Sequence, residues 1–311
     1  MRFGRHLTPG REREEGTLLT EFVREVRTLT REWSAKRDHP IRLGVRVPAH
    51  PDAAAGLGMD GVSWAREGLV DMLVPCPFWT TSDFDIPVEL WKERLGEQAA
   101  GVAVTPGLEF NARPWPGGKP VANDLACVYG FATAARARGA DAIYLFNFMD
   151  SGTRPVSEAN YRTLVEKGVG DSYVATQERR FPVCYRDTVP DGFSSGVSLP
   201  VKGRRGAVFQ IHIGAAPAAG TAHLVFGLAK AEGSAAVTWD VKVNGRPVLP
   251  DTDLAACTGL GGGPARAIRF AVPGNVLQSG HNAVTVKQTP EGPEQTLVWA
   301  EIRLEPLRTL R

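Results

Sequence analysis

The sequence lacks the features that would place the protein in a membrane, on a nucleic acid or around a metal ion. No apolar run is long enough to cross a bilayer, and the opening MRFGRHLTPGREREEG has no apolar signal-peptide core. The 36 Lys and Arg residues are balanced by 34 Asp and Glu residues, without a basic block. Four widely spaced cysteines form neither a CxxC zinc motif nor a disulfide framework. We therefore expect no membrane, nucleic-acid, metal or cofactor partner.

The first part of the chain alternates between helical and strand patterns. Apolar residues recur at helical spacing in stretches that each lead into a short, continuously apolar run. This alternation is typical of a parallel sheet covered by helices. The expected helices are Leu18–Ser34, Gly61–Glu67, Val88–Gln98, Val121–Arg138 and Glu158–Lys167, and the expected strands are Ile41–Val47, Val70–Pro75, Val102–Pro106 and Ala142–Phe148.

The pattern changes completely after about Ser172. Helical periodicity disappears, and short alternating strands separated by Gly, Pro and Asn turns replace it. The Asn244-Gly245 pair is the sharpest hairpin signal in the chain. We expect two domains, an α/β domain at 1–172 and an all-β sandwich at 173–311. The expected strands of the sandwich are Val208–Ile213, His223–Leu228, Val237–Val243, Ala267–Val272, Ala283–Lys287 and Leu297–Leu304.

Candidate functional residues follow the expected parallel strands. Four βα units are half of the eight in a TIM barrel, whose active residues lie just past the strands' carboxyl ends. Glu109 ends the third strand beside aromatic and amide side chains, which suits a catalytic carboxylate of glycoside hydrolysis. Aromatic faces nearby suit stacking against a pyranose ring. The candidate substrate-binding residues are Arg46, His50, Trp79, Asn111, Trp115, Asn147 and Asp150.

Each of these residues also has a structural interpretation. A strand-end glutamate such as Glu109 is more often a solvated loop residue or a helix partner than a catalytic group. An isolated histidine such as His50 is more often structural than a ligand. Arg46 lies on a buried strand and would need a carboxylate or substrate partner. Asp83 and Asp85 are expected to cap the helix that follows them.

Four stretches of the first part carry a family resemblance. TLLTEFVREVRTLTREW, IRLGVRVPA, DGVSWAREGLVDMLVPCPFW and VAVTPGLEF resemble the bacterial family 10-like glycosyl hydrolases over about residues 1–170. The resemblance implies that the four strands are the fifth to eighth of a TIM barrel and that Glu109 ends strand seven, the place of the nucleophile. It also implies a retaining mechanism whose acid/base residue would follow strand four, upstream of Met1.

The half-barrel implied by the resemblance would leave two strand edges and an apolar sheet face uncovered. Such a half-barrel is expected to self-associate, misfold or catalyse poorly. We therefore predict negligible glycosidase activity for the 311-residue chain expressed alone. Secretion or a periplasmic location is expected if the true N-terminus lies upstream, since no signal peptide is present in the sequence as given.

The second part resembles galactose-binding-like jelly rolls through the run IRFAVPGNVLQSGHNAVTVKQ. Such folds bind carbohydrate or only support a neighbouring catalytic domain, and the supporting role is favoured. The whole sequence is interpreted as an O-glycosyl hydrolase that acts on a poly- or oligosaccharide. The alternative is a non-catalytic carbohydrate-binding or structural protein.

Overall fold

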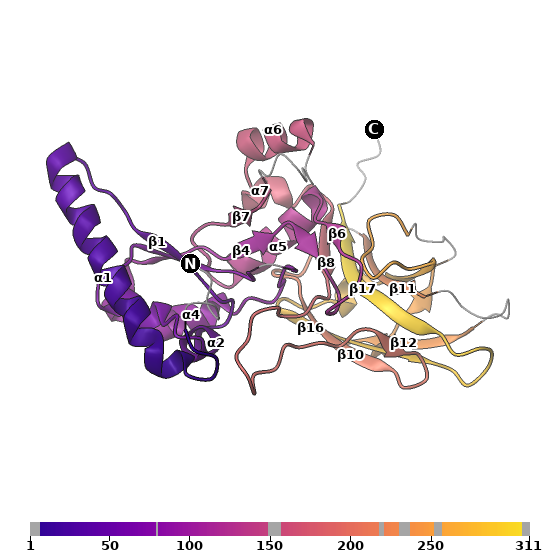
Figure 1. Cartoon of the computed structure of the whole chain (residues 1–311). Helices are drawn as coiled ribbons and strands as arrows, with labels where there is room; N and C mark the ends of the chain where they lie inside the picture. Colours follow the sequence, from indigo (N-terminus) through magenta and orange to yellow (C-terminus); the bar gives the residue numbers. More distant parts are fainter. Residues whose placement is uncertain are drawn as a thin grey trace.

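The computed structural model describes residues 7–78, 80–148, 157–217, 221–229, 237–251 and 257–306. It consists of a helix-rich part with parallel strands, followed by a part built from antiparallel strands (Figure 1). The elements of the first part are α1 (Glu12–Arg37), β1 (Gly44–Val47), α2 (Pro51–Gly56), α3 (Gly61–Arg66), β2 (Met72–Pro75), α4 (Val88–Leu95), η1 (Glu97–Ala99), β3 (Ala103–Val104), β4 (Gly107–Glu109), β5 (Asn111–Ala112), β6 (Val121–Ala122), α5 (Leu125–Ala137), β7 (Tyr144–Phe146), α6 (Glu158–Lys167) and α7 (Asp171–Val174).

The parallel strands pair in chain order. β1 pairs with β2 and β2 with β3, whereas β4 pairs with β7, and both sets are parallel. β3 and β4 are successive pieces of one extended segment, with Pro106 between them accepting a 3.0 Å hydrogen bond from the Tyr144 amide. Consecutive parallel neighbours place the carboxyl ends of all these strands at the same edge. The assignment of this arrangement to half of a TIM barrel remains a proposal.

The helix expected at Val121–Arg138 begins later than predicted. The Asp124 carboxylate accepts a 2.9 Å hydrogen bond from the Cys127 amide and so fixes the N-terminus of α5 at Leu125. The residues before it are extended instead, because β6 pairs antiparallel with β5. Local apolar periodicity did not distinguish this short strand from the first turn of the helix.

The antiparallel part contains two sheets that share one core. Their strand orders are β10-β16-β12-β13 and β14-β15-β11-β17-β8. Phe209 of the first sheet and Phe226 of the second are both buried in the same apolar cluster, with ring centroids 6.5 Å apart. The elements are β8 (Arg179–Pro182), β9 (Val201–Lys202), β10 (Ala207–His212), β11 (Thr221–Leu228), β12 (Trp239–Val243), β13 (Arg246–Pro247), β14 (Leu249–Pro250), β15 (Arg266–Val272), η2 (Gly274–Val276), β16 (His281–Gln288) and β17 (Thr296–Glu305).

The hairpin predicted at Asn244-Gly245 is confirmed. Val243 pairs with Arg246 across a two-residue turn, and both turn residues have positive φ, 50° at Asn244 and 78° at Gly245. Asn and Gly tolerate this left-handed backbone, which matches the twist of the flanking strands. The turn residues thus fix the register of β12 and β13.

The two parts meet where α5 packs on β8. A Cβ added at Gly130 would lie 2.1 Å from the carbonyl oxygen of Arg180, so only glycine permits this close approach. The Arg180 side chain also donates to the Asp124 carboxylate at 2.6 Å. Helix α5 therefore belongs to the parallel part and at the same time supports the antiparallel part.

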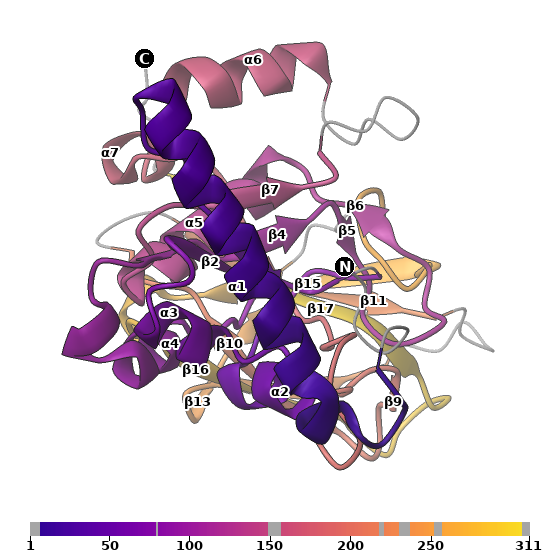
Figure 2. The same cartoon turned by 60° about the vertical axis from the view of Figure 1, so that its left-hand side comes forward.

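The strands β1 and β7 lie at opposite ends of the parallel series, and none of the strands described pairs with their outer edges. Helix α1 lies on the side of the parallel part that faces away from the antiparallel sheets (Figures 1 and 2). It exposes the apolar side chains of Leu18, Phe22, Leu29 and Trp33. Self-association through this half stays a prediction. No helix in the described ranges could span a membrane.

Candidate functional site

Glu109 lies at the carboxyl end of β4, and its side chain is fully buried. Its backbone is held by two buried polar side chains. Ser82 donates its hydroxyl to the Glu109 carbonyl at 2.6 Å, and Asn123 donates its amide to the same oxygen at 2.7 Å. The Asn123 amide also donates to the Ser82 hydroxyl at 2.7 Å. These bonds fix the position from which the carboxyl group projects.

The Glu109 carboxyl group is poorly satisfied by the protein. One oxygen, Oε1, accepts a long hydrogen bond of 3.4 Å from the Asn147 amide, and among the described residues no donor bonds to the buried Oε2. Burial raises the pKa of Glu109 to about 7, although the Asn147 amide, the Phe110 backbone amide and the Arg46 charge act in the opposite direction. At neutral pH the group is thus poised between its protonated and ionised forms.

Asn147 follows β7 and adopts an unusual backbone conformation. Its φ is 63°, in the left-handed region, which asparagine tolerates better than most non-glycine residues. Because β7 pairs with β4, Asn147 and Glu109 lie together where these two adjacent parallel strands end.

Arg46 of β1 lies between two aromatic rings. Its guanidinium carbon is 3.6 Å from the ring centroid of Phe146 and 4.3 Å from that of Phe78, and its Nη2 donates to the Phe78 carbonyl at 3.3 Å. Such cation–π contacts orient a guanidinium without neutralising it. The positive charge of Arg46 lowers the pKa of Glu109, so the two residues share one electrostatic environment.

His50 has a structural contact. Its Nδ1 accepts a 3.2 Å hydrogen bond from the Asp52 amide and so caps α2. Its ring lies 5.1 Å from the ring of Phe193, and burial lowers its pKa. The capping bond leaves Nδ1 engaged, so this atom does not serve a substrate.

Two other predicted binding residues, Asn111 and Trp115, have contacts elsewhere in the structure. The carbonyl of Asn111 in β5 accepts a 2.7 Å hydrogen bond from the amide of Ser82, which lies in the loop after β2. The Trp115 ring packs against the antiparallel core, with Gly118 and Gly262 close against it. The predicted residues Trp79 and Asp150 lie outside the described residues.

Asp187 was missed by sequence analysis. It follows β8, and its carboxylate accepts from the amides of Phe78 at 3.2 Å and Thr80 at 2.7 Å. The hydroxyls of Thr80 and Thr188 donate to it at 3.2 and 2.7 Å. The charge of Asp187 also raises the pKa of Glu109. Asp187 therefore anchors the loop after β2 from the antiparallel part, a long-range contact that no local motif signals.

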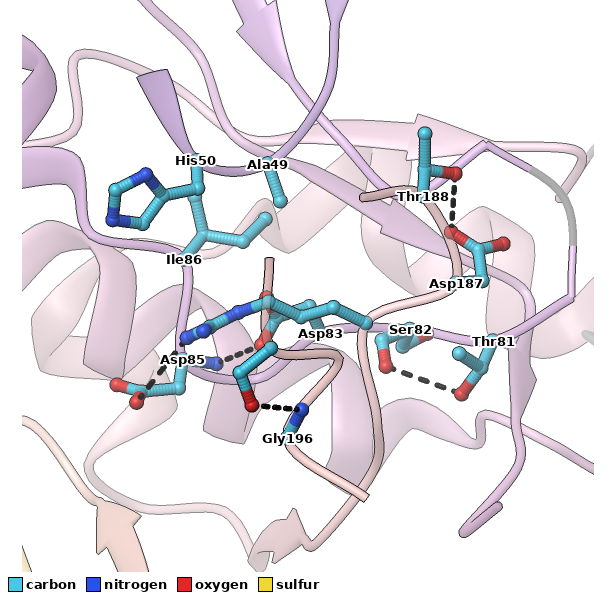
Figure 3. A network of polar contacts seen from close by, with 12 residues as sticks. Ala49, His50, Thr81, Ser82, Asp83, Asp85, Ile86, Asp187, Thr188 and Gly196 are labelled. Atoms are coloured by element: carbon cyan, nitrogen blue, oxygen red, sulfur yellow. Dashed lines mark hydrogen bonds and ion pairs between the residues drawn. The ribbon is translucent and has the colours of Figure 1, made fainter. Parts of the chain in front are cut away.

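The expectation that Asp83 and Asp85 cap the next helix is wrong. Helix α4 begins at Val88 with no side-chain cap. Asp83 instead accepts from Arg186 Nε at 3.0 Å, and Asp85 accepts from the side chains of Arg138 and His281. Figure 3 shows both aspartates beside the segment that carries Gly196. Asp83 and Asp85 therefore bond to residues of the antiparallel part, across the contact between the two parts.

Comparison with known proteins gives little further information. No family model and no curated protein matches the sequence. The structure of BuGH86 in complex with neoagarooctaose is 16% identical with a TM-score of 0.30, over 43% of this chain and 19% of that chain. A β-porphyranase of glycoside hydrolase family 86 from the human gut bacterium Bacteroides plebeius is 16% identical with a TM-score of 0.28, over 42% and 20%.

The chain thus spans about a fifth of the length of these proteins. Both of these structures come from glycoside hydrolase family 86, so they give no support to the expected resemblance to family 10-like glycosyl hydrolases. TM-scores this low establish neither a shared fold nor a shared function.

Proposed function

We propose that the protein is a glycoside hydrolase component in which Glu109 is the catalytic carboxyl group. The observation that carries the proposal is a fully buried strand-end carboxyl whose Oε2 has no hydrogen-bond partner among the described residues. An unpaired buried polar atom costs stability, and the cost is greater when the atom belongs to a group that can ionise. A sugar hydroxyl or glycosidic oxygen is a partner that would satisfy it.

The protonation state of Glu109 favours proton transfer. With a pKa of about 7, the group can carry a proton at neutral pH and donate it to the leaving oxygen of a glycoside. The family resemblance implies the nucleophile role for this position instead. Of the two roles we propose the proton donor, because a nucleophile must be ionised to attack the anomeric carbon.

Glycoside hydrolysis needs a second carboxyl group, and Asp187 and Asp83 are poor candidates for it. From described residues alone, Asp187 accepts four hydrogen bonds, donated by Phe78, Thr80 and Thr188, which occupy its lone pairs. Asp83 is buried and paired with Arg186. Neither of these two described acids supplies a nucleophile, and negligible glycosidase activity of the chain expressed alone stays a prediction.

Supplying the missing nucleophile tests the proposal. The purified chain is incubated with aryl glycosides and with galactan, glucan, xylan and mannan oligosaccharides, with and without sodium azide. We expect azide to attack the anomeric carbon while the glycosidic C–O bond breaks and Glu109 protonates the leaving oxygen. The product is a glycosyl azide, which mass spectrometry detects.

Two variants make the result specific. Glu109→Gln removes the proton donor, and the azide-dependent rate is expected to fall by about 10²- to 10⁴-fold. Glu93→Gln, an exposed position on α4, is expected to leave the rate unchanged. Absence of any glycosyl azide across the panel, or an equal rate in Glu109→Gln, would contradict the proposal and favour a non-catalytic role.

A further inference from the structure

A cavity of about 220 Å³ lies between the two parts of the protein, and Glu109 is not among the residues that line it. One wall is the loop that carries Asp83 and Asp85, and the opposite wall is the edge strand β10. The segment after β8 closes it with Arg186, Ser195 and Ser198. At ~30 Å³ for each water molecule, the volume equals about seven waters.

The polar groups around the cavity are fixed by contacts within the protein. Arg186 donates to Asp83 at 3.0 Å and lies 3.9 Å from a carboxylate oxygen of Asp85. The Asp85 amide donates to Asp83 at 2.9 Å. These charged groups are therefore held in place before any ligand arrives, which lowers the entropic cost of binding.

His212 and Gln210 of β10 add neutral polar groups to the cavity lining. The His212 ring is nine-tenths buried, and its Nδ1 accepts a 3.3 Å hydrogen bond from the Gly214 amide. Burial lowers the pKa of His212 to about 4, so the imidazole is neutral at pH 7 with its proton on Nε2. Such a ring donates a hydrogen bond without adding charge.

The rest of the lining is apolar. Phe84 and Phe209 are buried side chains at the cavity, and Val208 lines it from an exposed position on β10. Charged acceptors, a guanidinium and apolar surface thus occur together in a space the size of one sugar ring. A pyranose presents the matching combination of hydroxyl groups around its edge and C–H groups on its face.

We propose that this cavity is a binding site for a single neutral pyranose unit. The charges argue against ions: the carboxylates of Asp83 and Asp85 repel an anion, and Arg186 already engages them in place of a cation. A neutral sugar can donate hydroxyl hydrogens to the carboxylates and accept from the guanidinium. The proposal shares only the class of ligand with the proposed function and needs no catalysis at Glu109.

Binding is tested on the full chain with methyl glycosides of glucose, galactose, mannose and xylose. Saturation-transfer NMR and calorimetric titration are expected to give a dissociation constant of order 1 mM for at least one of them. Val208→Trp fills the cavity from its rim and is expected to weaken binding at least ~10-fold. Gln210→Ala removes a polar group from the lining and is expected to weaken it less.

Val165→Trp is the matched control, since Val165 is 67% exposed on α6 and Val208 is 60% exposed. Both changes add the same bulk at the surface, and the control is expected to bind sugar like the original chain. Glu109→Gln is titrated in parallel, so that binding at the proposed catalytic carboxyl group is told apart from binding in this cavity. No binding of any methyl glycoside, or equal weakening by Val165→Trp, overturns the site. Loss of binding only in Glu109→Gln would place the sugar elsewhere.

Discussion

Two glutamates, one in each part of the protein, are fully buried but differ in how their charges are satisfied. Glu301 in β17 accepts from Arg180 at 3.1 and 2.8 Å through one oxygen and from Arg303 through the other. Among the described residues, Glu109 in β4 has one side-chain partner, the Asn147 amide at 3.4 Å, and no cation bonds to its carboxyl group. A charge buried for structure is paired, whereas an unpaired one costs stability and points to another use.

The paired cluster also joins the two parts. Arg180 donates to Glu301 in the antiparallel sheet, to Asp124 at the start of α5, and to the Gly259 carbonyl at 2.8 Å. Among the described residues of the parallel part, no comparable group bonds to Glu109, since Arg46 is stacked between aromatic rings instead. The comparison therefore separates a group that holds the fold together from one that the fold leaves available.

We expect the largest change in stability when the ion pair between Arg180 and Glu301 is broken. Arg180→Met leaves Glu301 buried without its main partner, and we expect the free energy of unfolding to fall by about 3–5 kcal/mol. Urea denaturation followed by tryptophan fluorescence measures the change. The double variant Arg180→Met with Glu301→Gln removes the stranded charge and is expected to recover more than half of the loss. A loss below ~1 kcal/mol would mean that the pair is not structural.

Removing the Glu109 carboxylate is expected to stabilise the protein instead. The pKa of Glu109 is raised from 4.5 to about 7 in the folded state, so ionisation opposes folding above pH 7 and not below pH 4.5. Glu109→Gln should therefore raise the free energy of unfolding by on the order of 3 kcal/mol at pH 8.5 and by less than ~1 kcal/mol at pH 5. Urea denaturation at both pH values checks this, and a pH-independent difference would refute the raised pKa.

Features that depend on a few neighbouring residues could be predicted from the sequence. The Asn244-Gly245 turn was predicted with its hairpin, because a two-residue turn with positive φ has few acceptable residues. Glu109 was placed at a strand end from the apolar run that precedes it. In both cases the signal lies within a few residues of the feature.

The contacts that define the site lie far apart in the chain and could not be predicted. Asp187 bonds to Phe78, 109 residues earlier, and Arg180 bonds to Glu301, 121 residues later. Periodicity and turn chemistry specify elements but not which elements meet. Asp83 was interpreted as a helix cap for this reason, since its partner Arg186 is supplied by the other part of the protein.

The smallest expected effect concerns Arg46, whose charge acts on the Glu109 carboxyl group. Because the charge of Arg46 lowers the pKa of Glu109, Arg46→Met should move the titration midpoint of Glu109 upward, above 7, as followed by ¹³C NMR of labelled glutamate. Arg46→Lys keeps a positive charge and is expected to leave the midpoint nearly unchanged, even though lysine does not stack between Phe78 and Phe146 as arginine does. If the lysine variant shifts the midpoint as far as the methionine variant, the stacked geometry and not the charge sets the pKa of Glu109. In that case the rings of Phe78 and Phe146, which position the Arg46 guanidinium, also help to set the pKa of Glu109.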